Sequence, residues 1–181
     1  MELDKAPLVI KTKRLTIRFV DLADAKDYFV FCSNPNVCRY LSFEPYKHVF
    51  QAKKAINNMI RSYLVNKDIN FSIILNETNR VIGSISLSIN DFHCADLGYL
   101  LDEKYWNKKI MSETVPEIIK VAFDYYKIDT LYAKYVKDNQ ASEKLLMNNG
   151  FKLMTINHGA FEKNNQVYDI YVTRLDNHYN L

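Results

Sequence analysis

Apolar and polar residues follow two different spacings in the first third of the chain. Leu15, Ile17 and Phe19 are separated by single polar residues, which predicts a strand with one buried face. From Asp21 to Phe31, and again from Val49 to Leu64, apolar residues recur at intervals of three and four, as they do on one side of an α-helix. The pattern therefore predicts one strand followed by two helices.

The middle third predicts antiparallel strands. Two apolar runs, Phe71–Leu75 and Val81–Ile89, flank a polar segment at 76–80 that is rich in turn-forming residues, and this arrangement predicts a β-hairpin. In the second run serine alternates with isoleucine or leucine, which indicates a sheet with one polar face. Residues Cys94–Leu101 predict the next strand of the same sheet.

The last third predicts a helix between two strands. The expected elements are a helical segment ending near Tyr126, a strand at Thr130–Lys137, a helix at Asn139–Asn149 and two final strands near Phe151–Asn157 and Gln166–Arg174. A strand-helix-strand passage inside an otherwise antiparallel sheet implies one parallel pair. We therefore expect an α+β fold in which residues 1–181 form a single domain, with a mixed, mostly antiparallel sheet of about seven strands flanked by helices.

Composition and charge narrow the classes of partner. Lys and Arg number 24 against 21 Asp and Glu, a net charge of +3, and no dense basic block occurs, so we expect no nucleic-acid partner. The apolar runs are too short for a membrane span or a signal peptide. The three cysteines lack metal-ligand spacing, as do the four histidines, which predicts no metal site. A cytoplasmic location is the simplest interpretation.

Three segments carry a resemblance to a known family. Residues 97–113, 138–142 and 148–151 resemble, in order and spacing, the GNAT superfamily of N-acetyltransferases and more narrowly its RimJ/RimL-like ribosomal-protein N-acetyltransferase branch. Shorter motifs agree with the branch's order at Lys13–Arg18, Asn34–Val37, Arg80–Ile85 and Tyr168–Tyr171. The resemblance implies a GNAT-like sheet that splits between its fourth and fifth strands around the cofactor.

The resemblance also implies acetyl-CoA as the cosubstrate and indicates which residues hold it. The pantetheine arm would pair with the backbone at Leu100 and Leu101 like an extra strand, and Asn139 would hold the arm near the thioester. A loop that leads into a helix N-terminus presents unpaired N–H groups to the diphosphate. The residues expected at the diphosphate are Lys108, Lys109, Ile110, Met111 and Ser112.

This chain departs from the family pattern around the diphosphate loop. Asn107 and Lys109 stand where the family usually has glycines, which would hinder close approach of the backbone to phosphate, although Lys108 and Lys109 add positive charge. Pro116 lies inside the helix that follows. Either Thr114 caps a helix that starts about a turn late, or a kinked helix starts at Lys109.

The resemblance indicates three positions at which a side chain could transfer a proton. Many relatives use a tyrosine on the helix after Asn139, but the matching residue here is Leu146, so that role is unfilled. Ser142 matches the serine that is the candidate general acid of the RimL-like branch; alternatively, it only bonds an amide at the helix end. Glu162 lies near the position of the branch's glutamate before the last hairpin; alternatively, it is an exposed loop carboxylate.

The acceptor is expected to be a primary amine. A protein or peptide α-amino group has a pKa near 7.7 to 8.0 and needs less help to lose its proton than a lysine does. Tyr46 and Glu44 are candidate acceptor-binding residues; core packing and a surface ion pair are the alternatives. A small-molecule acetyltransferase for a polyamine or an aminoglycoside, and a non-catalytic GNAT-like binding domain, remain open. Either a monomer or a homodimer is expected.

Overall fold

The strands of the computed structural model form one sheet. The structure describes residues 9–65, 68–90 and 93–177. Its strands are β1 (Ile10–Lys11), β2 (Leu15–Phe19), β3 (Asp68–Leu75), β4 (Arg80–Ile89), β5 (Cys94–Leu101), β6 (Thr130–Val136), β7 (Lys152–Lys163) and β8 (Gln166–Asp176). Their spatial order is β1-β2-β3-β4-β5-β6-β8-β7. All neighbours are antiparallel except β5 and β6. The mixed α+β fold is confirmed, with β1 as an additional edge strand.

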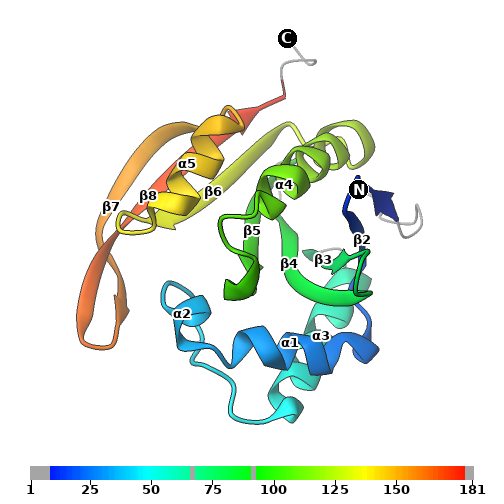
Figure 1. Ribbon diagram of the computed structural model, residues 1–181. Coiled ribbons are helices and arrows are strands. Elements are labelled where there is room, and N and C mark those ends of the chain that lie inside the picture. The colour runs from blue at the N-terminus through cyan, green and yellow to red at the C-terminus, as the bar shows by residue number, and fades with distance from the viewer. Residues whose placement is uncertain (1–8, 66–67, 91–92, 178–181) are drawn as a thin grey trace.

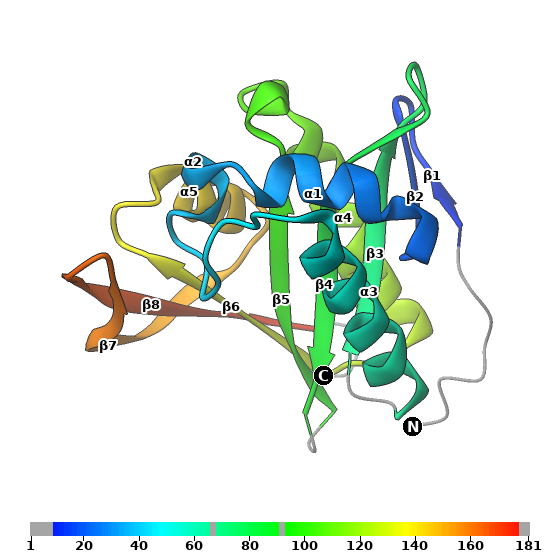
Figure 2. The same ribbon diagram turned by 90° about the horizontal axis from the view of Figure 1, so that it is seen from below.

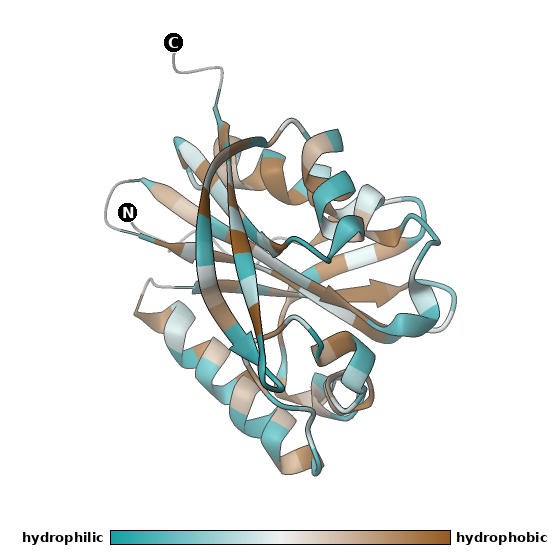
Figure 3. Cartoon of the chain, turned by 90° about the vertical axis from the view of Figure 1, so that its left-hand side faces the viewer, coloured by the Kyte–Doolittle hydropathy of each residue, from teal (hydrophilic) through white to brown (hydrophobic). Residues whose placement is uncertain are grey.

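Helices cover both faces of this sheet. They are α1 (Ala25–Cys32), α2 (Pro35–Cys38), α3 (Val49–Leu64), α4 (Ile110–Lys120) and α5 (Gln140–Asn148), with 3₁₀ turns η1 (Leu22–Asp24) and η2 (Glu103–Tyr105) and a π-helical turn η3 (Val121–Tyr125). Helices α1 and α3 contact each other and strands β3 and β4, whereas α4 and α5 lie on the opposite face (Figure 1, Figure 2). In Figure 3 the hydrophobic residues concentrate along the strands between these two layers.

Two hydrophobic clusters hold the layers in place. The larger one joins the sheet to α4 through Val115 and Ile118, and to α5 through Leu146, all three fully buried. The smaller one joins α1 to α3 through Phe31 and Ile56. Burial of one such side chain contributes about 1.5–3 kcal/mol. Leu146, which occupies the position of the tyrosine in many relatives, is therefore a core residue here.

Strands β5 and β6 pair over only part of their length. Their parallel register runs from Cys94↔Thr130 to Leu97↔Ala133. Beyond Leu97, residues 98–101 of β5 still pair with β4 but have no partner on β6, and the two strands spread apart (Figure 1). This confirms the split in the sheet, and it lies at the carboxyl ends of two parallel strands, the usual place for a ligand in such sheets.

Helix α4 begins at Ile110 and continues through Pro116. Its first intrahelical bond runs from the amide of Glu113 to the carbonyl of Lys109, at 3.2 Å. Thr114 lies inside the helix, where its hydroxyl donates to the carbonyl of Ile110 at 3.0 Å. The alternative in which Thr114 caps a helix that starts a turn later is therefore wrong. The helix widens into the π-turn at its end, where the amide of Tyr126 donates to Val121 at 3.0 Å.

The last hairpin is longer than its sequence pattern indicates. Strands β7 and β8 are joined by Asn164 and Asn165, whose φ angles of 51° and 59° are those of a type I′ turn. Glu162 lies on β7 opposite Val167, so it is an exposed strand residue and not a loop residue. Among the described residues, no helix is long and apolar enough to cross a membrane.

Candidate active site

The turn before α4 has the backbone of a glycine turn without its glycines. Asn107 and Lys109 have φ angles of 60° and 58°, in the left-handed region. Asparagine enters this region more readily than most residues, whereas a lysine there costs about 1 kcal/mol. Both side chains are exposed. Asn107 and Lys109 therefore adopt the left-handed backbone that glycine favours while their side chains stay exposed.

The amides at the start of α4 follow directly after this turn. Lys109 is the N-cap residue and gives no side-chain cap. The amides of Ile110, Met111 and Ser112 precede the first intrahelical bond, so they have no carbonyl partner within the helix. Such amides, at the positive end of the helix dipole, form an anion-binding position. The sequence prediction for the diphosphate residues fits this geometry.

Arg14 and Glu113 fix the position of the turn. Arg14 donates from Nη1 to the carbonyl of Lys108 at 2.9 Å and from Nε to Oε2 of Glu113 at 2.7 Å. The hydroxyl of Thr12 and the amide of Arg14 donate to Oε1 of Glu113 at 2.5 and 2.9 Å. Burial would raise the pKa of Glu113, but these hydrogen bonds outweigh it, and the pKa lies below its usual range. Neither residue is predicted as a site residue from the sequence, although each lies in a segment that resembles the family.

The edge of β5 is open where an extended chain could pair. Leu100 and Leu101 pair with β4, and beyond Leu97 the β6 side of the strand has no strand partner. The carbonyl of Leu101 accepts from the indole of Trp106 at 2.9 Å, which ties the loop after β5 to the strand. This open edge and the α4 amides fit the arm and the diphosphate of acetyl-CoA.

A hydrogen-bonded hydroxyl pair lies at the start of α5. The Oγ of Ser142 is 2.7 Å from the Oη of Tyr99, and Ser142 is only 8% exposed. Asn139 caps the helix by accepting the amide of Ser142 at 3.2 Å. The side chain of Asn139 therefore performs the capping, and the hydroxyl of Ser142 is bound to a residue of β5.

Burial raises the pKa of Tyr99 to about 12, and the hydrogen bond with Ser142 offsets only part of that rise. The phenol is therefore protonated throughout the physiological range and can donate. The sequence gives no sign of a role for the Tyr99 hydroxyl, because the resemblance places only the backbone of this strand beside the arm. Its contact with Ser142 links positions 43 residues apart.

Glu162 and its neighbour Lys163 differ in their exposure to solvent. Glu162 is exposed, whereas Lys163 is 8% exposed and reaches the loop after α2. Glu44, which is 74% exposed, lies 3.4 Å from the Nζ of Lys163, so it forms the surface ion pair that sequence analysis left open. Tyr46 packs on Phe43 with ring centroids 5.2 Å apart, and burial raises its pKa to about 12.

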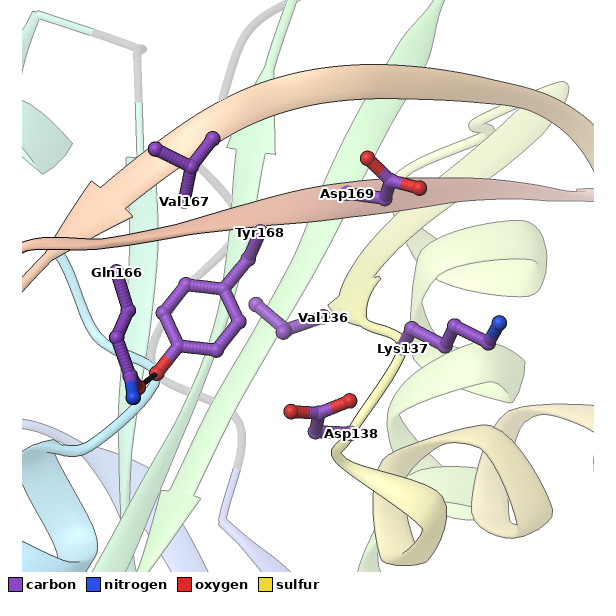
Figure 4. A pocket seen from close by; sticks show the side chains of 7 residues that line it. All are labelled: Val136, Lys137, Asp138, Gln166, Val167, Tyr168 and Asp169. Atoms are coloured by element: carbon purple, nitrogen blue, oxygen red, sulfur yellow. Dashed lines mark hydrogen bonds between the residues drawn. The ribbon is translucent and has the colours of Figure 1, made fainter.

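Two cavities lie against the β7–β8 hairpin. One of about 450 Å³ is lined by Val136, Lys137, Asp138, Gln166, Val167, Tyr168 and Asp169, at the end of β6 and the start of β8 (Figure 4). The other, of about 460 Å³, is lined by Pro35, Asn36, Cys38, Arg39, Glu44, Pro45, Lys163 and Asn164. Within the described residues, no group of three or more His, Cys, Asp or Glu is placed to hold a metal ion.

Comparisons with known proteins agree with this geometry. The sequence model of the acetyltransferase (GNAT) domain matches residues 14–152. An uncharacterized N-acetyltransferase named p20, from Bacillus licheniformis, is 30% identical over 166 residues, which cover 91% of this chain and 93% of that protein.

Solved structures share the fold. RimL, a ribosomal L7/L12 α-N-protein acetyltransferase solved with coenzyme A, superposes with a TM-score of 0.85 at 20% identity, covering 93% of this chain and 97% of that one. Spermidine N-acetyltransferase from Vibrio cholerae, solved with coenzyme A and spermine, has a TM-score of 0.81 at 18% identity, covering 91% and 96%. Because the domain match extends from β2 to β7 and includes the split, the chain belongs to the GNAT family of acetyl-CoA-dependent acetyltransferases.

Proposed function

We propose that the protein acetylates the α-amino group of a protein or peptide N-terminus, by direct attack on acetyl-CoA in a ternary complex. The observation that carries the proposal is the Ser142–Tyr99 pair at the split. The hydroxyl of Ser142 is bonded to a phenol, and its backbone amide is bonded to the side-chain amide of Asn139; neither partner is a strong base. This chemistry suits an acceptor whose pKa is near 7.7 to 8.0, because a large fraction of it is neutral without help.

The turn at residues 106–112, called the diphosphate turn below, and the open edge of β5 orient acetyl-CoA. The amides of Ile110, Met111 and Ser112 bind the diphosphate, and Lys108 and Lys109 add positive charge beside it. The backbone at Leu100 and Leu101 pairs with the arm, which directs the thioester along the split toward Asn139. Binding therefore comes mostly from the backbone. For this reason asparagine and lysine can replace glycine at positions 107 and 109.

Ser142 supplies the proton for the leaving sulfur. The acceptor nitrogen forms a bond to the thioester carbon, and the carbon–sulfur bond breaks. The thiolate takes the hydroxyl proton of Ser142, which Tyr99 replaces from its own hydroxyl. The attacking nitrogen loses its proton to water. Water returns one proton to Tyr99, so the protein gains and loses no proton overall. Glu162 remains a second candidate for a proton-handling role, from the resemblance to the RimL-like branch.

The acceptor side is formed by the loop after α2 and the β7–β8 hairpin. Tyr40 and Tyr168 meet edge to face with centroids 6.1 Å apart, and Glu44 lies exposed further along the same loop. An exposed carboxylate suits an ammonium group on a flexible peptide end, and the face of a tyrosine ring attracts a cation. RimL, an α-N-protein acetyltransferase by its name, has the same fold.

A polyamine acceptor is the second candidate. Asp138 and Asp169 both line the cavity at the end of β6, and hydrogen bonds from the amide of Gly159 and from His158 keep the pKa of Asp169 below its usual range. Two carboxylates that line one cavity would attract a chain with several positive charges. A protein of the same fold carries the name of spermidine N-acetyltransferase.

An acceptor panel tests the proposal. Release of free thiol from acetyl-CoA is measured with a decapeptide that has a free N-terminus, with the same peptide blocked by N-acetylation but containing lysine, and with spermidine and kanamycin. We expect kcat/KM for the free peptide to exceed that for spermidine at least tenfold, and the blocked peptide to be inert. Preference for spermidine or kanamycin, or turnover of the blocked peptide, would overturn the assignment.

A further inference from the structure

One carboxylate joins α2 to the loop that precedes the diphosphate turn. Glu103 of η2 accepts from the Nδ2 of Asn34 through Oε2 at 2.7 Å and from the Nδ2 of Asn36 through Oε1 at 2.8 Å. Asn34 is also the N-cap of α2, because its Oδ1 accepts the amide of Asn36 at 2.9 Å. The cap residue of α2 and its neighbour Asn36 are therefore both bonded to a residue that follows β5.

A buried lysine holds the other end of the same segment. The Nζ of Lys163, on β7, donates to the carbonyls of Cys38, Leu41 and Phe43 at 3.1, 2.7 and 2.6 Å. Three acceptors match the three hydrogens of an ammonium group. A buried ammonium without such partners is strongly unfavourable, so the segment and the hairpin stay together.

Residues 34–44, called the α2 segment below, thus connect the two sides of the split. Glu103 lies between β5 and the diphosphate turn, and Lys163 lies beside the turn of the β7–β8 hairpin. In Figure 1, α2 lies below the opening between β5 and β8, in agreement with these contacts. Asn36 and Lys163 also line the same cavity of about 460 Å³.

We propose that Glu103 and Lys163 are positioning residues that couple the diphosphate turn to the acceptor side through the α2 segment. This rests on the proposed function only in placing the diphosphate of coenzyme A at residues 106–112. Coenzyme A binding orders the turn, the turn fixes Glu103 through η2, and Glu103 fixes the segment that Lys163 holds against the hairpin. A ligand on one side therefore changes the order of the other.

Hydrogen–deuterium exchange with coenzyme A alone tests the coupling. In the wild-type chain, we expect saturating coenzyme A to slow amide exchange at least fivefold both at 106–112 and at 36–46. In Glu103→Ala, protection at 106–112 should persist and protection at 36–46 should disappear, with the Kd for coenzyme A within threefold of wild type. A residue that only stabilises the fold would change exchange equally with and without coenzyme A.

Two further variants complete the experiment. Asn36→Asp places a negative charge against Glu103 at an exposed position and should also remove protection at 36–46 without disturbing folding. Glu77→Ala, in the exposed β3–β4 turn, changes the charge by the same amount as Glu103→Ala and should keep both protections. Protection at 36–46 that survives in Glu103→Ala and Asn36→Asp, or that is absent in wild type while 106–112 is protected, overturns the coupling. Failure of coenzyme A to bind wild type at all overturns the proposed cofactor position and the coupling together.

Discussion

At the scale of single residues, hydroxyl and amide groups meet at the carboxyl ends of β5 and β6. Ser142 is held by Tyr99 on one side and by Asn139 on the other. The bond with Tyr99 restricts the hydroxyl of Ser142, and the bond to Asn139 holds its backbone amide. Preorganised polar groups account for much of enzymatic rate enhancement. The proposed chemical step therefore depends on single hydroxyl groups at this position.

Removing the hydroxyl of Ser142 should slow the chemical step and leave cofactor binding intact. General acids contribute about 10²-fold or more, so we expect Ser142→Ala to lower kcat about 100-fold while the Kd for coenzyme A, measured by calorimetry, stays within twofold. Ser88→Ala on β4 is the matched control and should retain wild-type kcat. An unchanged kcat in Ser142→Ala would exclude Ser142 from proton transfer.

Removing only the hydroxyl of Tyr99 should have a smaller effect. Tyr99→Phe keeps the ring and leaves the hydroxyl of Ser142 without the hydroxyl to which it is bonded, so we expect kcat to fall about tenfold. Because the pKa of Tyr99 lies near 12, its protonated form persists below that value, and the wild-type kcat/KM should rise as the acceptor amine deprotonates and show no decline up to pH 10. A decline centred near pH 8 to 9 would contradict this assignment.

At the scale of elements, side chains from distant segments fix loops and helix ends. Arg14 and Glu113 join the start of β2 to the first turn of α4 and to the carbonyl of Lys108. Asp24 joins η1 to β2 and β3, because it accepts from Arg18 at 2.7 Å and from the buried hydroxyl of Ser72 at 2.6 Å. These contacts set the angles at which short elements leave the sheet.

Loosening the diphosphate turn should weaken cofactor binding. Arg14→Ala removes the donor to Lys108 and the partner of Glu113, so we expect the Kd for coenzyme A to rise about tenfold, equivalent to about 1.4 kcal/mol. Lys13→Ala removes the same charge from an exposed neighbour and should change the Kd less than twofold. Equal effects of the two variants would mean that net charge, and not the position of the turn, controls affinity.

The ion pair of Asp24 should stabilise the fold only above acidic pH. Burial would raise the pKa of Asp24, but the bonds from Arg18, Ser72 and the amide of Asp21 outweigh it, so the pKa is lower when folded than when unfolded. Its contribution is therefore complete above about pH 4 and is lost as pH falls through the lower folded value. Asp24→Asn should lower the free energy of unfolding in urea by about 3 kcal/mol at pH 7. This difference should shrink below pH 4, and a difference independent of pH would contradict the mechanism.

At the scale of the whole molecule, the split lies between two bodies of different construction. One carries α1, α3 and strands β1 to β5, and the other is the β6-β8-β7 ribbon with α5. They meet at the short parallel pairing of β5 with β6, at the α2 segment and through the larger hydrophobic cluster, which includes residues from both. A ligand in the split contacts both bodies and should therefore stabilise the entire fold.

Coenzyme A should raise the melting temperature of the protein. Any ligand that binds only the folded chain stabilises it, by about 2.7 kcal/mol at a concentration 100 times the Kd. For a chain of this size we expect a shift of roughly 5–10 °C in a thermal scan, and adenosine alone, which lacks both arm and diphosphate, should shift it much less. If coenzyme A caused no shift in the melting temperature, the proposed cofactor position would be wrong.

Local patterns alone determined most of the elements of this protein. Helix α3 and strand β5 occupy the residues that their spacing predicts, and the cap at Asn139 lies where its side chain type indicates. These features depend on interactions within a few residues, which the order of side chains specifies directly. Strand β1 could not be predicted in this way, because two residues form a strand only by pairing with β2.

Tertiary structure decided the contacts on which the site depends. The pairing of Tyr99 with Ser142 and the reach of Lys163 to carbonyls more than 100 positions away result from sheet order and hairpin length, not from spacing. The start of α4 at Ile110 also required it, because packing of Val115 and Ile118 against the sheet outweighs the local preference of Pro116. Long-range burial can override a local signal, and only the folded chain shows where it does.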